Sequence, residues 1–443
     1  MSAARIIRSH SVILNPGCAL IFALAFLLAG PAIAQEVTEQ EISAAGEEAV
    51  QQVEGEEAGE TSVDEGEESA WQEEAALNED PEARRRAKIE ETPGLRNLWP
   101  KFELYASVRL HAINNFNVEN ELTEFALGDG ASRMGVRGEW QASENWWLFG
   151  RAEGGFDILD TFTHKAGEDG DGFVLRERLL FAGIDSENLT ATFGKNWSAY
   201  YKIAGMADRF SIFGGSAAGV YNAFTDGGAT GMGRADDVLQ ARIYTNSLKA
   251  LRIKPFNLNV QYQQGQPIPH VSNLKYDRAY GASAWLESQG DRGIGVAYQK
   301  SELDKEAAEA RSAGIDGDAE AIAFSFRSYG ERWYAALVVA WLDNVETTDQ
   351  LQYFNGRGAE LYIQWQLKDR WWLIGGGNWL VPYDDDPQAG EYEVAYAILG
   401  LRYTFDSFKR MIYAEYRLDS GTLWDGTPRK NELTLGFRWD FGK

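Results

Sequence analysis

Arginine side chains recur on segments of this chain in which polar and apolar residues alternate. Side chains on a β-strand point to opposite faces with period two, so residues of one parity share a face. In KFELYASVRLHA (101–112) the even-numbered residues are apolar and the odd-numbered ones are polar or amphipathic. Arginine stays charged at any working pH, so arginines on one face act on ions and dipoles rather than as acids or bases. The arginines with this polar-face parity are Arg109, Arg133, Arg137, Arg151, Arg176 and Arg178.

Residues for catalysis or metal binding are few and far apart. Beyond residue 34 the only histidines are His111, His164 and His270, and no metal-ligand spacing joins them. Nothing distinguishes a serine or water-activating site beside a histidine. The run Gly375-Gly376-Gly377 lies in a predicted strand and not at a strand-to-helix turn, which argues against a phosphate cradle. The sequence therefore predicts that the chain is not an enzyme, and it predicts no catalytic residue, cofactor, bound metal or nucleic-acid partner.

The segments that carry the arginines have the length and pattern of membrane-spanning strands. AELYIQWQL (359–367) and the final ELTLGFRWDF (432–441) alternate in the same way as 101–112. Lengths of about ten residues suit a tilted transmembrane strand, whereas strands of soluble domains average about five or six. Arg, Glu, Gln and Asn recur along the polar face, which favours a barrel with lipid outside and water inside. No later segment approaches about 18 consecutive apolar residues, which excludes a helical membrane protein.

Short and long connections alternate between these segments. Short polar links occur at 142–145, 185–188, 367–370 and 406–409, and longer loops rich in Gly, Asp and Glu lie between them. This asymmetry is typical of outer-membrane barrels, with turns in the periplasm and loops outside. A count of about sixteen strands leaves a water-filled lumen. The tryptophans beside short links fit an aromatic girdle at one interface: Trp146, Trp147, Trp371 and Trp372.

One connection, between the predicted strands near 189–193 and 238–244, is much longer than the others. Phe193-Gly194-Lys195 enters it and Gly231-Met232-Gly233-Arg234 leaves it, with Asp208 and Phe213-Gly214-Gly215 between them. On these features the sequence resembles the general diffusion porins of the Gram-negative outer membrane, from about residue 100 to its end. The resemblance implies an all-β fold, a transmembrane antiparallel barrel of about 16 strands with this third external loop folded inward. It also implies a homotrimer in which each subunit is a channel.

The resemblance further implies a constriction in which acids and backbone carbonyls of the third loop face a ladder of arginines. Ile212 stands where the loop of that family usually carries an acid. An alternative is that the arginines only pair with lumen acids such as Glu103, Glu139 and Glu153. The implied pore-constriction residues are Arg109, Arg133, Arg137, Arg151, Arg176, Arg178, Asp208, Asp226, Asp236 and Asp237, with the loop backbone at Phe213, Gly214 and Gly215.

The N-terminal part differs in composition from the rest. An apolar run from Cys18 to Ala29 followed by Ala32-Ile33-Ala34 predicts a signal peptide over 1–34. Between Gln35 and Ala83 there are 18 acidic residues and no Lys or Arg, so 35–95 is expected to be an acidic, disordered, low-complexity segment in the periplasm. It is either a solvated tail or a segment for interaction or oligomerisation. The barrel is expected over 96–443.

The sequence is therefore interpreted as a passive diffusion channel for small hydrophilic solutes and ions, located in the bacterial outer membrane. Its expected surroundings are membrane lipid and lipopolysaccharide. The acidic composition favours a modest preference for cations, although the arginines act in the opposite sense. Two other functions stay open: a substrate-specific channel for phosphate or a sugar, and a structural outer-membrane anchor whose acidic segment binds periplasmic partners.

Overall fold

The computed structural model describes residues 100–116, 122–143, 145–159, 175–245, 256–288, 291–304, 308–383, 386–405 and 409–442. The expected signal peptide (1–34) and acidic segment (35–95) lie outside these residues. The first strand begins at Lys101, close to the expected start of the barrel.

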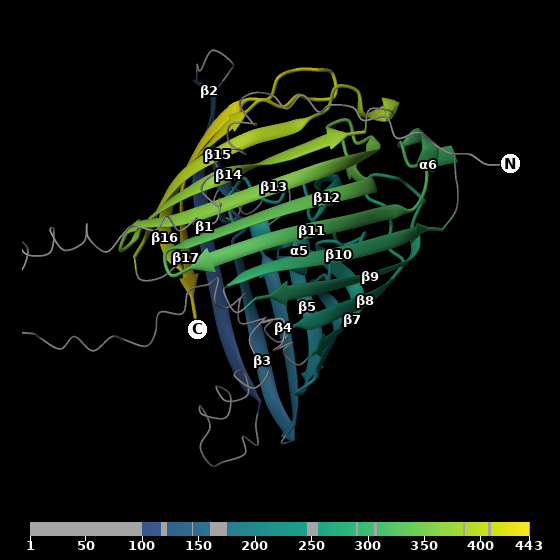
Figure 1. Ribbon diagram of the computed structural model, residues 1–443, viewed down its shortest axis with the longest axis vertical. Coiled ribbons are helices and arrows are strands. Elements are labelled where there is room, and N and C mark those ends of the chain that lie inside the picture. The colour runs from purple at the N-terminus through teal and green to yellow at the C-terminus, as the bar shows by residue number, and fades with distance from the viewer. Residues whose placement is uncertain are drawn as a thin grey trace, which may run out of the picture. The chain divides into compact units, whose positions relative to one another are not determined.

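The described chain forms one antiparallel sheet that closes on itself (Figure 1). Apart from β2 and β3, which both pair with β1, each strand pairs with its neighbours in sequence. The last strand returns to the first, with Arg109 opposite Arg438 and Phe116 opposite Asn431. The strands are β1 (Lys101–Phe116), β2 (Leu122–Asp129), β3 (Arg133–Ser143), β4 (Trp146–Gly155), β5 (Arg176–Asp185), β6 (Leu189–Trp197), β7 (Arg234–Tyr244), β8 (Asn257–Gln264), β9 (Tyr276–Glu287), β10 (Arg292–Leu303), β11 (Ala319–Gly330), β12 (Trp333–Thr347), β13 (Tyr353–Lys368), β14 (Trp371–Pro382), β15 (Val394–Thr404), β16 (Arg410–Asp419) and β17 (Asn431–Phe441).

The second strand of the barrel is interrupted. β2 pairs with residues 110–116 of β1, and β3 pairs with residues 101–107, so the two pieces follow one line. At the break, Ala131 has a left-handed φ of 67°. The break is fastened to β1, because the Gly130 amide donates to the Arg109 carbonyl at 2.8 Å and the Arg109 amide donates to Ser132 Oγ at 3.0 Å. The barrel therefore has sixteen strands, and the predicted fold class is confirmed.

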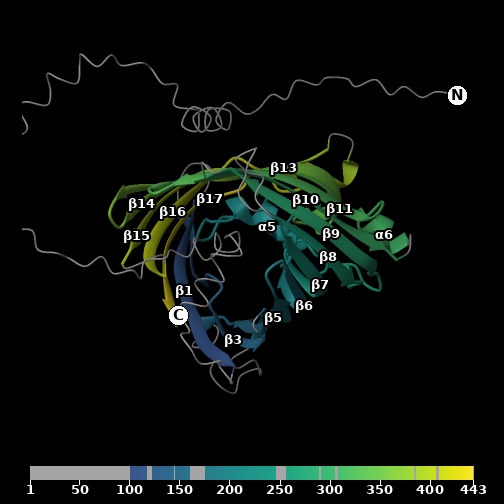
Figure 2. The same ribbon diagram turned by 60° about the horizontal axis from the view of Figure 1, so that its bottom comes forward.

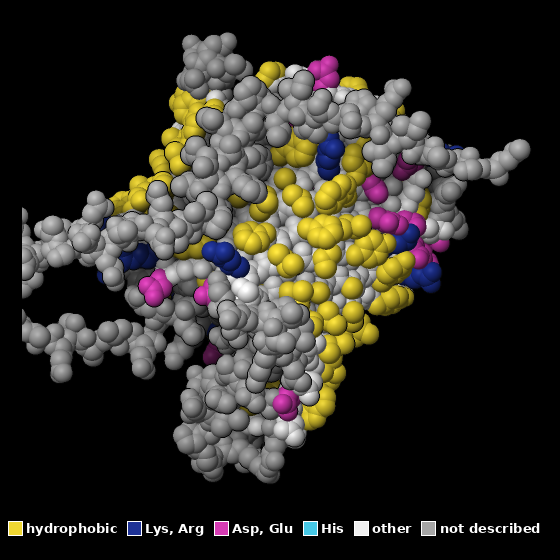
Figure 3. All heavy atoms as spheres, in the orientation of Figure 1, with side chains coloured by type: hydrophobic (Ala, Val, Ile, Leu, Met, Phe, Trp, Pro, Cys, Tyr) yellow, Lys and Arg dark blue, Asp and Glu magenta, His cyan; other side chains and the backbone are white. Residues whose placement is uncertain are grey.

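The alternation separates an apolar outer face from a polar inner one. Leu104 and Leu399 are 78% and 62% exposed, whereas Glu360 is 1% exposed and points inward. Figure 3 shows hydrophobic side chains spread over the outer surface of the strands that face the viewer. The sequence-based register is thereby confirmed: the even-numbered residues of β1 face out and Ser107, Arg109 and His111 face in.

The predicted tryptophan girdle is only half right. Trp146 and Trp371 are each 42% exposed on the outer face, but Trp372 is 7% exposed and packs inside against Met411 and Tyr413. Trp147 shares the inner parity of β4. Adjacent residues on a strand cannot both face lipid, so each pair contributes one tryptophan to each face.

The long connection after β6 lies inside the ring of strands. Figure 2 shows α5 (Tyr201–Ala204) inside the ring of strands. The same connection contains η2 (Gly205–Ala207) and η3 (Asn222–Phe224), while α6 (Ala308–Ser312) and η5 (Pro387–Ala389) belong to other loops. Among the described residues, no helix is both long enough and apolar enough to cross a membrane. We call residues 198–233 the inner loop.

Candidate functional site

Two buried glutamates attach the inner loop to one side of the barrel. Glu360 Oε1, on β13, accepts hydrogen bonds from the backbone amides of Ala217 (2.7 Å) and Ala218 (3.0 Å). Glu415, on β16, accepts from the amides of Ser211 (2.7 Å) and Ile212 (3.2 Å). Both carboxylates are almost fully buried, at 1% and 0% exposure. Because the two side chains are buried, any loop path that gave up these contacts would leave buried amides without partners, so the contacts fix the path of the loop.

The predicted backbone element Phe213-Gly214-Gly215 lies in this attached part. The Phe213 carbonyl accepts from Tyr396 Oη at 2.9 Å and from Asn378 Nδ2 at 3.3 Å. Gly215 has a left-handed φ of 70°, and a Cβ there would lie 2.7 Å from the Tyr221 ring, so the tight turn requires glycine. This carbonyl is therefore bonded to the wall.

Two of the predicted acids form an ion-pair cluster at the base of the inner loop. Lys195 Nζ lies 3.0 Å from Asp226 and 2.5 Å from Asp236, and Arg234 Nε lies 3.2 Å from Asp226. Burial opposes ionisation of Asp226, but the positive charges of Lys195 and Arg234 outweigh it, so the pKa of Asp226 lies below its usual value. This cluster closes the base of the loop.

The other two predicted acids also have local partners. Asp208 accepts from Tyr201 Oη at 3.5 Å, and its Oδ1 lies against Gly214, where an added Cβ would be 2.6 Å away. Asp237 has a left-handed φ of 46° and accepts from Gln266 Nε2 at 3.2 Å. No ion pair joins Asp208, Asp226, Asp236 or Asp237 to the predicted arginines within the described residues.

The predicted arginines gather on the opposite side, on the inner face of β17, β1, β3, β4 and β5. Arg109 stands directly across from Arg438 of the last strand, and Arg133 starts β3 opposite Ser107. Arg109, Arg133, Arg178 and Arg438 are close enough to interact electrostatically with one another. We call Arg109, Arg133, Arg151, Arg178 and Arg438 the arginine wall.

Two carboxylates lie within the arginine wall, and both are already paired. Glu153 is 2.7 Å from Arg151 and 2.9 Å from Arg178, and it also accepts from Tyr105 Oη at 2.9 Å. Asp440 is 2.5 Å from Arg438 and accepts from Ser107 Oγ. The alternative that the arginines pair with lumen acids therefore holds for Arg151 and Arg178, which pair with Glu153.

The other four predicted arginines, Arg109, Arg133, Arg137 and Arg176, differ in their exposure and in whether they form an ion pair. Arg137 pairs with Glu103 at 2.6 Å, and both side chains are more than a third exposed. Arg176 is exposed at the first position of β5. Arg109 donates to Ser107 Oγ at 2.9 Å, and neither Arg109 nor Arg133 makes an ion pair with any described carboxylate. Arg109 and Arg133 are thus the predicted positions whose charge is least compensated.

The tip of the inner loop reaches the arginine wall through Ile212. A Cβ placed on Gly130 would lie 3.5 Å from Ile212 Cδ1 and 3.3 Å from Arg109 Cβ. The backbone of Ile212 is held by Glu415, so the fixed loop presents an apolar side chain beside Arg109. The inner loop thus contacts the barrel wall beside Arg109 through an apolar side chain.

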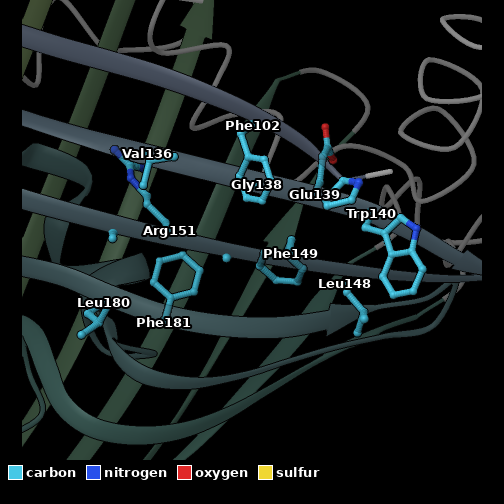
Figure 4. Close-up of a pocket in the computed structure, with 13 residues that line it drawn as sticks. Phe102, Val136, Gly138, Glu139, Trp140, Leu148, Phe149, Arg151, Leu180 and Phe181 are labelled. Carbon is cyan, nitrogen blue, oxygen red and sulfur yellow. The ribbon is translucent and has the colours of Figure 1, made fainter. Parts of the chain in front are cut away.

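A separate groove of about 430 Å³ lies on the outer face of β1, β3, β4 and β5 (Figure 4). Outward-facing Phe102, Trp140, Leu148 and Leu180 border it. Gly150 deepens it, because it carries no side chain, whereas the Phe102 ring lies over Gly138. Its lining is mostly apolar, in contrast to the inner face of the same strands.

Sequence reasoning missed several residues of the site. Arg438 has inward parity in the final strand, and closing the barrel places it beside Arg109, so this signal was available. Parity also directs Glu360 and Glu415 inward, but the partners of these two residues and of Lys195 have no signal in the sequence, because they are backbone amides or loop acids whose path is set only by folding. Among the described residues, no group of three His, Cys, Asp or Glu side chains is placed to hold a metal ion.

Comparisons with known proteins identify the fold. No family model and no curated protein sequence matches the chain. Among solved structures, it is similar to Salmonella typhi OmpF in complex with daunomycin (TM-score 0.62, 19% identity, 77% of this chain and 98% of that one). An anion-selective porin from Comamonas acidovorans gives a TM-score of 0.55 at 14% identity, covering 77% and 100% of the two chains. The trimer form of Vibrio cholerae OmpT gives a TM-score of 0.51 at 15% identity, covering 77% and 99%. The chain therefore has the porin barrel fold.

Proposed function

We propose that this chain is a passive diffusion channel for small hydrophilic solutes and ions across the bacterial outer membrane. Its selectivity is set by the charged constriction between the inner loop and the arginine wall. The observation that carries the proposal is the division of the lumen. One half of the inner wall binds the inner loop through Glu360 and Glu415, and the other half presents charged side chains.

The two faces of the barrel support this proposal. An apolar outer face suits lipid, and a barrel of about sixteen strands leaves an aqueous lumen. The loop that narrows the lumen is fixed at its base by Lys195 and at its tip by buried carboxylates, so the passage is permanent. A fixed, charged opening acts on solutes by size and electrostatics, without a bound cofactor.

Conductance in a planar lipid bilayer tests this function. The purified, folded chain is expected to produce discrete, non-saturating conductance steps that scale with salt concentration. Vesicles carrying it should swell in a small neutral sugar but not in a long dextran. A preparation that is folded, shown by a mobility shift on heating, and yet never conducts would contradict the channel and favour a structural anchor.

A homotrimer is the proposed assembly, with the groove of Figure 4 as part of the subunit contact. Gly150 lets a neighbouring backbone approach this face closely, whereas most of the outer face carries large side chains suited to lipid. One structurally similar protein is described in a trimer form. Mass measured in detergent should be three times that of the chain. Gly150→Trp should lower it, whereas the same change at Leu399, on the lipid face, should not.

The proposed location of residues 35–95 is the periplasm, after removal of residues 1–34 as a signal peptide. The strong acidity of this segment supports a solvated state outside the lumen. Protease added to sealed vesicles that carry the barrel in one orientation locates it. Cleavage of the segment only when the periplasmic side is accessible is the expected result.

A further inference from the structure

The constriction lacks the acid that would balance its arginines. The inner loop places Ile212 beside the arginine wall, with its Cδ1 close to Gly130 and Arg109. Its side chain also contacts the cluster of Trp372, Met411 and Tyr413. An apolar group at this place neither neutralises the arginines nor competes for their hydrogen bonds.

The charges of the arginine wall leave a positive excess. Within the described residues, its five guanidinium groups face two carboxylates, Glu153 and Asp440, so the wall carries three more positive charges than negative ones. The nearby Asp129 does not pair with an arginine. Its two oxygens accept the backbone amides of Ser132 (2.5 Å) and Ile158 (3.1 Å).

The acids of the inner loop are directed elsewhere. Asp226 lies in the cluster with Lys195 and Arg234 at the base of the loop, and Asp208 is packed against Gly214 within it. The carboxylates facing the loop from the other wall, Glu360 and Glu415, accept its backbone amides. Within the described residues, no acid of the inner loop therefore forms an ion pair with Arg109 or Arg133.

We infer that the constriction prefers anions, and that its preferred solutes are small organic carboxylates with an apolar body. This inference rests on the proposed channel function and reverses the modest cation preference expected from composition. Guanidinium groups bind carboxylates through two parallel hydrogen bonds, and Arg109 and Arg133 retain donors for them. The apolar body of such a solute would contact Ile212 as it passes. A hydrated polar group would gain no hydrogen bond from this side chain. Ile212 is then a specificity-determining residue.

The sign of the selectivity is tested by the reversal potential of the full-length channel under a potassium chloride gradient. The reversal potential should be measured at an ionic strength of about 0.01 M, where the Debye length is about 30 Å. The unmodified chain is expected to be anion-selective. Ile212→Glu should lower the chloride-to-potassium permeability ratio by about threefold or more, because a carboxylate would then face Arg109. Ile212→Leu, the matched control, should leave the ratio unchanged.

A second variant protects the test against misfolding of the loop. Arg109→Gln with Arg133→Gln should lower the same ratio, and discrete conductance steps show that this variant is folded and open. A channel that conducts but prefers cations, or whose ratio is unmoved by both Ile212→Glu and the arginine pair, overturns this inference and leaves the channel function intact. A folded chain that never conducts overturns both.

The class of solute is tested by comparing two anions of similar size. Butyrate has an apolar body, and 2,3-dihydroxypropanoate carries hydroxyl groups instead. With their potassium salts on opposite sides of the bilayer, butyrate is expected to be the more permeant, and Ile212→Ser should remove about half or more of that advantage. Equal permeability of the two anions in the unmodified channel overturns the assignment of an apolar body.

Discussion

The two halves of the inner wall use polar side chains in opposite ways. On β13–β16, Glu360, Glu415 and Asn378 are buried and bonded to the inner loop. On β1 and β3, Arg109 and Arg133 face the lumen, and neither forms an ion pair with a carboxylate in the described chain. Both halves come from the same alternating pattern, in which every second residue is polar.

This difference shows that an inward polar residue has two distinct fates in such a barrel. Where the inner loop covers it, it becomes part of the folded core and its loss leaves buried amides unsatisfied. Where the loop leaves it uncovered, it acts on solutes and its loss changes selectivity rather than stability. This distinction would be contradicted if mutations on the loop side left stability unchanged, or if mutations of the arginine wall destabilised the barrel.

The largest effect is expected on the loop side. Glu360→Ala removes the acceptor of the Ala217 and Ala218 amides, and two buried donors without partners should lower the free energy of unfolding by about 3–5 kcal/mol. Denaturant titration in phospholipid vesicles measures this change. The detached loop should also become sensitive to protease added to the outer side.

Two variants sharpen the Glu360 result. Glu360→Gln keeps a carbonyl oxygen that accepts one or both amides, so it should lose much less stability. Glu103→Ala, in an exposed pair with Arg137 on the opposite wall, should cost at most about 1 kcal/mol. If Glu103→Ala were as costly as Glu360→Ala, the division between the two halves would be wrong.

A smaller effect is expected for a single neutral hydrogen bond on the loop side. Tyr396→Phe removes the 2.9 Å bond to the Phe213 carbonyl, which still accepts from Asn378. The expected loss is about 0.5–1.5 kcal/mol in the same titration. Tyr262→Phe, on the outer face and 51% exposed, is the control and should change stability by less than about 0.5 kcal/mol.

On the arginine wall the free energy of unfolding should hardly change. Arg109→Gln with Arg133→Gln removes like charges that repel one another, so stability should stay within about 0.5 kcal/mol or rise. The contrast is Arg327→Gln, which breaks a buried ion pair with Glu287 at 2.5 Å and should cost about 3–5 kcal/mol. A loss of several kcal/mol in the Arg109 and Arg133 variant would mean that these arginines are structural.

No effect on conductance is expected from removing residues 35–95. A chain in which the signal is joined directly before residue 96 should insert and conduct like the full chain, because both walls of the constriction lie between Lys101 and Phe441. Single-channel conductance and unfolding free energy are the measurements. A folded barrel that no longer conducts would assign the segment a part in the channel.

The sequence predicts the barrel well because alternation is a local property. The register of β1 and the short turns follow from residue parity and connection length, whereas the inward loop was implied by the resemblance to the general porins. Arg178 was also predicted to point inward. A register shift between Glu153 and Gly154 of the neighbouring strand interrupts the regular alternation beside it. Bulges of this kind depend on the neighbouring strand and leave little trace in one segment.

The partners of the charged residues were less predictable. Asp226 and Asp236 were expected near the arginines, yet Lys195 and Arg234 hold them at the base of the loop. The choice between Arg109 and Lys195 as a partner depends on the path of the loop, which Glu360 and Glu415 determine from strands more than 120 residues away. Long-range contacts of this type cannot be deduced from parity.

The interruption between β2 and β3 has a consequence for how the barrel can diversify. β2 pairs within the described chain with β1, and its hydrogen-bond ladder ends where Gly130 and Ser132 bond to Arg109. Residues added to or removed from β2 would alter the height of the rim, while the ladder of β3 restarts below the break in its own register. The rim that meets the cell's surroundings can therefore change in evolution or by design without displacing the arginines beneath it.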